Sequence, residues 1–133
     1  LSILGNDLCI ANHLNFHGVL SNEDLFSYVS SSNIFIMLSE EQSDGDVEGF
    51  GIAILEANAC GIPAIGSKYS GIEDAISDGF SGILVNPKNE DEILDAINLI
   101  LQDYDNFSKN ALEWSENFRW KSIIKRYIAA LNF

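Results

Sequence analysis

The sequence predicts an α/β domain, with a doubly wound parallel sheet that carries helices on both faces. Short apolar runs alternate with segments of helical periodicity along the whole chain. The apolar runs are continuous, as in strands that are covered on both sides. No repeat, linker or low-complexity tract interrupts this alternation, and 133 residues suit one domain at most.

The N-terminal segments are expected to begin with short strands at residues 1–4 and 15–18, around a turn of helix. A helix follows at residues 21–30, with Ser21 as its N-cap and Asp24 in the capping-box position. The apolar run NIFIML at residues 33–38 predicts a central parallel strand. The polar, acidic segment at residues 39–47 favours a solvated loop over a mobile lid.

The alternation continues to the C-terminus. An apolar helix is expected at residues 52–59, where Gly61 and Pro63 provide stop signals. Strands are expected at residues 62–65 and 83–85, with a short helix at 72–77 between them. Asn89 caps a helix that runs to Leu101 with one apolar stripe, and two more helices follow at residues 106–117 and 120–131.

The most informative segment is EGFGIAILEANACGIP at residues 48–63, in which Glu48 and Glu56 stand eight residues apart. Gly49 and Gly51 allow a sharp turn into the helix, whose first amides and dipole favour an anion such as phosphate. A carboxylate on each side of a phosphate site suits a ligand with hydroxyls at both ends, as in a nucleotide sugar. Acidic residues near helix N-termini are also common for dipole reasons alone, so the spacing by itself is weak evidence.

Other segments, in the same order along the chain, strengthen this interpretation. The chain resembles the retaining glycosyltransferases of family 4, the glycosyl transferases group 1, which have the GT-B fold. The resemblance covers nearly the whole chain, and Ser70 stands where the family pattern has a glycine. The segments that carry it are LSILG (1–5), NFHGV (15–19), EGFGI (48–52), LEA (55–57), ACGIPAIG (59–66), SGIEDAI (70–76), DGFSGILV (78–85) and FRW (118–120).

The resemblance implies that residues 1–133 are the Rossmann-like, C-terminal donor-binding domain of such an enzyme, without its first β–α unit. The domain that binds a glycan or lipid acceptor would then lie outside this chain. The full enzyme is expected to transfer a sugar from a nucleotide-diphosphate sugar with retention of configuration. The chain alone is expected to be inactive, because the family's diphosphate-binding Arg and Lys belong to the absent unit.

The resemblance also implies roles for particular residues. Glu48 is the predicted catalytic residue and contacts donor-sugar hydroxyls, while Glu56 accepts hydrogen bonds from both ribose hydroxyls. The backbone of residues 50–52 donates to sugar and phosphate oxygens, Leu55 lines the nucleoside pocket, and the main chain at 18–19 lies near the base. The predicted donor-binding residues are thus Phe50, Gly51, Ile52, Leu55, Glu56, Gly18 and Val19.

Charge and composition limit the other possibilities. A net charge of −13 argues against nucleic acid and against direct contact of this part with an anionic membrane. No cofactor or metal is expected, because the spacing of Cys9, Cys60, His13 and His17 suggests no site and the family needs no metal. Cys9 and Cys60 are expected to be buried, reduced thiols. Together with the lack of a signal or membrane-spanning segment, they predict a cytoplasmic protein, and the parent enzyme could still lie peripherally on the membrane.

Two other classes stay open at this point. A nucleotide-sugar epimerase or phosphorylase on the same GT-B fold would share the donor motifs. A non-catalytic α/β module that binds nucleotides, or a receiver domain, would also have acidic residues at strand ends. The receiver pattern fits poorly, because no acidic pair follows the first expected strand and no single acceptor Asp follows the 33–38 run.

Overall fold

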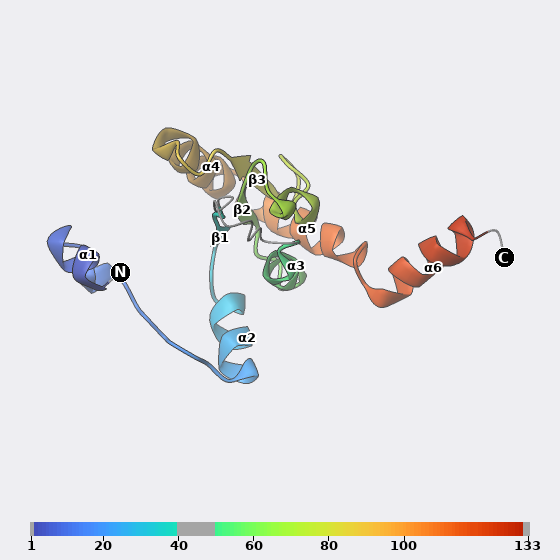
Figure 1. Cartoon of the computed structure of the whole chain (residues 1–133), viewed down its shortest axis with the longest axis horizontal. Coiled ribbons are helices and arrows are strands. Elements are labelled where there is room, and N and C mark those ends of the chain that lie inside the picture. The colour runs from blue at the N-terminus through green and yellow to red at the C-terminus, as the bar shows by residue number, and fades with distance from the viewer. Residues whose placement is uncertain (1, 40–49, 132–133) are drawn as a thin grey trace, which may run out of the picture.

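The centre of the molecule is a parallel three-stranded sheet. The computed structural model describes residues 2–39 and 50–131 (Figure 1). Strands β1 (Phe35–Met37), β2 (Ala64–Ser67) and β3 (Gly82–Val85) lie in the order β1-β2-β3. Ile36 pairs with Ile65, which pairs in turn with Ile83. The three strands expected in this part of the chain are therefore confirmed, with the second one beginning two residues later than expected.

Helices cover both faces of this sheet, as predicted. One face packs against the helix that precedes β2 and the short helix that follows it, through Ile54, Ala64, Ile72, Ala75 and Ile76. The other face packs against the two long helices after β3, through Ile65, Val85, Ala96, Ile100 and Phe107. Ala64 and Ile65 are neighbours on β2 and point to opposite faces, which is the period of two that a strand imposes.

The helices follow the expected order. Ser21 caps α2 as expected, by accepting a hydrogen bond from the Asp24 N–H at 3.1 Å. The Asp24 carboxylate accepts a hydrogen bond of 2.7 Å from the Ser21 hydroxyl, whereas a capping box has it accept from the backbone N–H of the cap. Helix α5 packs against both α3 and α4, so it joins the helices of the two faces. The described helices are α1 (Ser2–Asp7), η1 (Ala11–His13), α2 (Asn22–Ser30), α3 (Ile52–Ala59), η2 (Gly71–Ala75), α4 (Glu90–Gln102), α5 (Tyr104–Glu116) and α6 (Trp120–Ala130).

The N-terminal segment differs from the prediction. Residues 2–7 form helix α1 where a strand was expected at residues 1–4, and residues 15–18 belong to no helix or strand. Helix α1 packs against η1 and lies apart from the sheet (Figure 1). A short apolar run has no preference that distinguishes strand from helix until a neighbouring strand pairs with it. No described strand does so here, and the helix satisfies its own backbone hydrogen bonds.

A smaller correction concerns the segment between β2 and β3, where the predicted helix at 72–77 is a 3₁₀ helix at residues 71–75. At the other end of the chain, α6 extends away from the sheet (Figure 1), and none of its residues is buried. The site motifs lie between these two ends, on the segments that surround β1 and β2.

Candidate functional site

Helix α3 begins with a turn that only glycine adopts easily. Gly51 is the N-cap, with φ 71° and ψ 49°, in the left-handed region of backbone conformation. A Cβ atom added to Gly51 would lie 3.1 Å from Ile54 Cδ1 and 3.6 Å from Ile72 Cγ1. Because Ile72 lies just after β2, these contacts place the start of α3 at the carboxyl end of the sheet, where ligands bind in open α/β folds.

The residue before this turn is held by its ring. Phe50 is half-buried, and its ring centroid lies 5.7 Å from that of Phe118. Its side chain therefore points toward the C-terminal end of α5, while Gly51 next to it is buried and Ile52 is exposed. The first amides of α3 have no partner within the helix, and its dipole favours an anion there.

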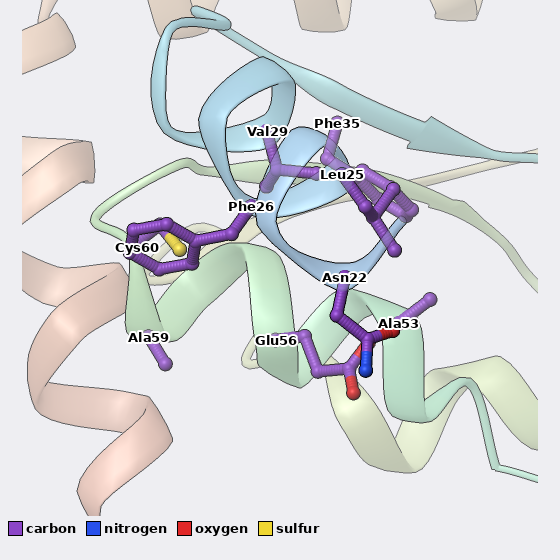
Figure 2. A pocket seen from close by; sticks show the side chains of 9 residues that line it. All are labelled: Asn22, Leu25, Phe26, Val29, Phe35, Ala53, Glu56, Ala59 and Cys60. Carbon is purple, nitrogen blue, oxygen red and sulfur yellow. The ribbon is translucent and has the colours of Figure 1, made fainter. Parts of the chain in front are cut away.

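Glu56 lies one turn into α3 and lines a pocket of about 470 Å³ between α2 and α3. Figure 2 shows Asn22 of α2 beside Glu56 at one end of this pocket, and Phe26 beside Cys60 at the other. The polar end of the pocket is formed by Asn22 and Glu56, and the remainder is apolar: it is lined by Leu25, Phe26, Val29, Phe35, Ala53, Ala59 and Cys60.

The other predicted site residues take different positions. Leu55 is half-buried and packs against the apolar cluster around Ile54, so it lies outside the lining of this pocket. Ile52 has 67% of its surface exposed at the start of α3. Gly18, with φ 63°, and the fully exposed Val19 lie in the loop just before the Ser21 cap of α2. Their predicted roles stay predictions, and Glu48 lies outside the described residues.

Three serines connect the carboxyl ends of β1 and β2. The Ser39 N–H donates to Ser67 Oγ at 3.1 Å, and Ser67 Oγ lies 3.2 Å from Ser70 Oγ. Ser70 Oγ also accepts a hydrogen bond of 3.4 Å from the Ile72 N–H at the start of η2. Ser70, which departs from the family pattern, thus fixes the turn that packs against Gly51. Sequence reasoning missed this network, because nothing local relates Ser39 to Ser67.

Lys68 does not face the pocket. Its ammonium group lies 3.3 Å from a carboxylate oxygen of Glu92 on α4. The Asn86 N–H, which donates to Glu92 at 2.9 Å, and this lysine hold the pKa of Glu92 below its ordinary value. Lys68 is thus paired with α4 and is not among the residues that line the pocket.

Asn22 is the residue of the pocket that the sequence did not reveal. It is the first residue of α2, directly after the cap, and its amide group lies beside Glu56 (Figure 2). A carboxylate and an amide can together accept and donate hydrogen bonds to vicinal hydroxyls. Among the described residues, no group of His, Cys, Asp and Glu side chains could hold a metal ion, and no helix is long and apolar enough to cross a membrane.

Comparison with known proteins gives one consistent family. The sequence pattern described as "Glycosyl transferases group 1" matches residues 6–119. The chain is 29% identical over 125 residues to a GDP-mannose-dependent alpha-(1-6)-phosphatidylinositol monomannoside mannosyltransferase of Mycobacterium tuberculosis, covering 90% of this chain and 32% of the relative. It is 37% identical over 84 residues to the amylovoran biosynthesis glycosyltransferase AmsK of Erwinia amylovora, covering 63% and 20%.

Solved structures agree with this result. Sucrose-phosphate synthase from Thermosynechococcus elongatus superimposes with a TM-score of 0.77 at 26% identity, over 98% of this chain and 32% of that protein. Anabaena HepE in complex with UDP-glucose superimposes with a TM-score of 0.73 at 24% identity, over 96% and 34%, which shows the fold alone. The chain spans about a third or less of the length of all these proteins.

Proposed function

The chain belongs to the family of glycosyl transferases group 1 and has the fold of a GT-B C-terminal domain, and from this premise we propose its function. Residues 1–133 are the donor-binding domain of a glycosyltransferase. The enzyme transfers a sugar from a nucleotide-diphosphate sugar to a glycan or lipid acceptor, with retention of configuration. The acceptor is bound by a part of the protein outside this chain, and no metal, cofactor or nucleic acid takes part.

The observation that carries the proposal is the position of Glu56 relative to the start of α3. Gly51 caps the helix, and Glu56 lines the pocket five residues later. At a rise of 1.5 Å per residue, the backbone of Glu56 lies about 6–8 Å along the helix axis from the first amides of α3. A diphosphate at those amides therefore leaves its ribose within reach of Glu56 and of the neighbouring Asn22. This order of anion and diol is that of a nucleoside diphosphate.

The proposed chemistry follows from this position. The amides of residues 50–52 stabilise the negative charge that develops on the diphosphate as the bond between the sugar and its phosphate oxygen breaks. Glu48 orients the donor sugar on the opposite side of the diphosphate from Glu56. Because the chain has a net charge of −13, further cations from other parts of the protein are needed to neutralise the diphosphate.

The relatives support a nucleotide donor but leave its base open. The mycobacterial relative is named as GDP-mannose-dependent, whereas HepE is solved with UDP-glucose. Their names differ in other respects as well: the mycobacterial relative is named as a phosphatidylinositol monomannoside mannosyltransferase, and AmsK as a glycosyltransferase of amylovoran biosynthesis. The proposal for this chain is therefore limited to the class of donor and the class of acceptor.

Substitution of the two carboxylates in the full-length protein tests the proposal. We expect Glu56→Ala to raise the donor KM about 10- to 100-fold, since hydrogen bonds to a charged group contribute about 1.5–3 kcal/mol. Glu48→Ala should lower kcat more than it changes donor binding. Glu113→Ala, an exposed carboxylate on α5, serves as the control. The assigned roles would be contradicted if both variants showed the same rise in donor KM and the same fall in kcat.

Two measurements test the remaining steps. Cys60 lines the same pocket as Glu56, so UDP or GDP should slow its alkylation, followed by mass spectrometry of the peptide that contains it. Cys9 is exposed, so the expectation that it is buried was wrong, and it serves as the internal control. The anomeric proton couplings of the product, measured by NMR, distinguish retention from inversion. Protection of neither thiol at saturating nucleotide would place the nucleotide elsewhere.

A further inference from the structure

Three aromatic side chains that the proposed function does not use form one contact series. Phe50 lies 5.7 Å from Phe118, with an angle of 54° between the ring planes. Phe118 lies 5.3 Å from Trp114, edge to face at 67°. Both distances fall in the range of about 4.5–7 Å in which aromatic pairs attract beyond simple burial. All three side chains are half-buried, so the series lies at the surface of the domain and not in its two apolar cores.

The far end of this series is fixed to the scaffold. Trp114 Nε1 donates a hydrogen bond of 2.9 Å to the carbonyl oxygen of Ala75, the last residue of η2. Trp114 is on α5, which packs along α3. The Phe118 N–H donates to the Ser115 carbonyl oxygen at 3.0 Å, so the backbone of Phe118 continues from the last turn of α5. Trp114 is therefore connected to η2 by a side-chain hydrogen bond, and Phe118 to α5 by a backbone hydrogen bond.

The near end of the series carries the proposed donor site. Phe50 directly precedes Gly51, whose left-handed turn opens α3. Ile72 of η2 also lies close to this turn, at 3.6 Å from the position of a Gly51 Cβ. The turn at residues 50–51 thus has two neighbours, Ile72 of η2 beside Gly51 and the ring of Phe118 beside the ring of Phe50. Movement of that ring would shift the amides that we assigned to the diphosphate.

We propose that Phe118 is a positioning residue for sugar transfer, which sets the backbone of residues 50–52 through the ring of Phe50 and is itself fixed by Trp114. This inference rests on the proposed function. It extends the site to a residue near the end of the chain that touches no part of the donor. It also gives the FRW segment a role in catalysis, through Phe118 alone: Trp120 is 79% exposed on α6 and lies outside the ring series.

Kinetics of the full-length protein test this role. Phe118→Leu keeps an apolar side chain but loses the ring, and we expect it to lower kcat/KM for the donor about 10-fold or more, because small misplacement of a catalytic group is costly. The acceptor KM should stay unchanged. Phe118→Tyr keeps the ring and should retain most of the activity. Phe80→Leu, which removes another half-buried ring outside the series, is the matched control and should behave as the wild type.

A double-mutant cycle separates positioning from general loss of packing. If Phe118 acts through Phe50, the variants Phe50→Leu and Phe118→Leu should each lower kcat/KM for the donor about 10-fold. The double variant should then have a kcat/KM only slightly below that of either single variant. Losses that multiply to about 100-fold would overturn the proposal, as would donor kinetics of Phe118→Leu that equal those of the wild type. A rise in the acceptor KM as large as the fall in kcat/KM for the donor would do so too.

A spectroscopic measurement on the unmutated site covers the case in which Phe118→Leu fails to fold. In protein labelled with 5-fluorotryptophan, the ¹⁹F resonance of Trp114, assigned through Trp114→Phe, should shift when UDP or GDP saturates the site. An unchanged resonance with calorimetrically proven nucleotide binding would refute the inference. Failure of the proposed function itself is distinguishable, because then the wild-type protein transfers no sugar and Glu56→Ala leaves nucleotide binding unchanged.

Discussion

Replacement of Gly51 by alanine isolates the feature that opens the candidate site. The substitution adds one methyl group to a residue with φ 71° in the left-handed region. It also places that methyl group 3.1 Å from Ile54 Cδ1, and Ile54 is completely buried in the cluster between α3 and the sheet. Two separate costs are therefore expected, one from backbone conformation and one from packing.

The magnitude of each cost can be worked out separately. An L-residue in the left-handed region costs about 1–2 kcal/mol relative to glycine. Overpacking of a filled core by a methylene costs about 1–3 kcal/mol, and the need for Ile54 to move by only a few tenths of an ångström favours the lower end. The free energy of unfolding should then fall by about 2–3 kcal/mol in Gly51→Ala.

Gly79 provides a matched control within the same chain. Its φ is also 71°, but a Cβ added there would meet nothing within 4 Å. Gly79→Ala should thus show only the conformational cost of about 1–2 kcal/mol. Urea unfolding, followed by circular dichroism, should give a lower midpoint for Gly51→Ala than for Gly79→Ala, with unchanged slopes. Equal midpoints for the two variants would refute the packing part of the reasoning, and a wild-type midpoint for Gly51→Ala would refute all of it.

Two further predictions concern the frame around the site. The Asn86 N–H and Lys68 lower the pKa of Glu92 in the folded protein, so this carboxylate contributes stability that is present above its unfolded pKa of about 4.3 and is lost as the pH falls through its folded pKa. Glu92→Gln should therefore lower the melting temperature at pH 7 but not at about pH 2. The control Glu90→Gln, in the same turn of α4, should have a smaller effect at pH 7. A difference in melting temperature between Glu92→Gln and the wild type that does not change with pH would contradict this prediction. Ser21→Ala should reduce the free energy of unfolding by about 1 kcal/mol through loss of the α2 cap, measured by urea unfolding, and an unchanged midpoint would contradict it.

The elements that the sequence predicted well are those with local signals. Ser21 and Asn89 cap α2 and α4 as expected, because their side chains accept from amides three residues later. The apolar runs became the three strands, and Gly51 takes the left-handed turn that the glycine pair suggested. The segment at residues 1–4 has only its hydrophobicity as a signal. Without a strand that pairs with it among the described residues, it forms a helix instead.

The residues of the candidate site show the same difference between local signals and contacts with distant segments. The spacing of Glu56 from the helix start follows from the chain itself, so the sequence could single out Glu56 as a candidate binding residue, and the structure places it in the lining of a pocket. Asn22 joins that residue only because α2 and α3 line the same pocket, and Phe118 reaches Phe50 only because α5 packs against α3. Such partners have no periodicity or spacing that would reveal them. A motif therefore predicts which residues act on the ligand, whereas the residues that hold them in place have to be found from packing.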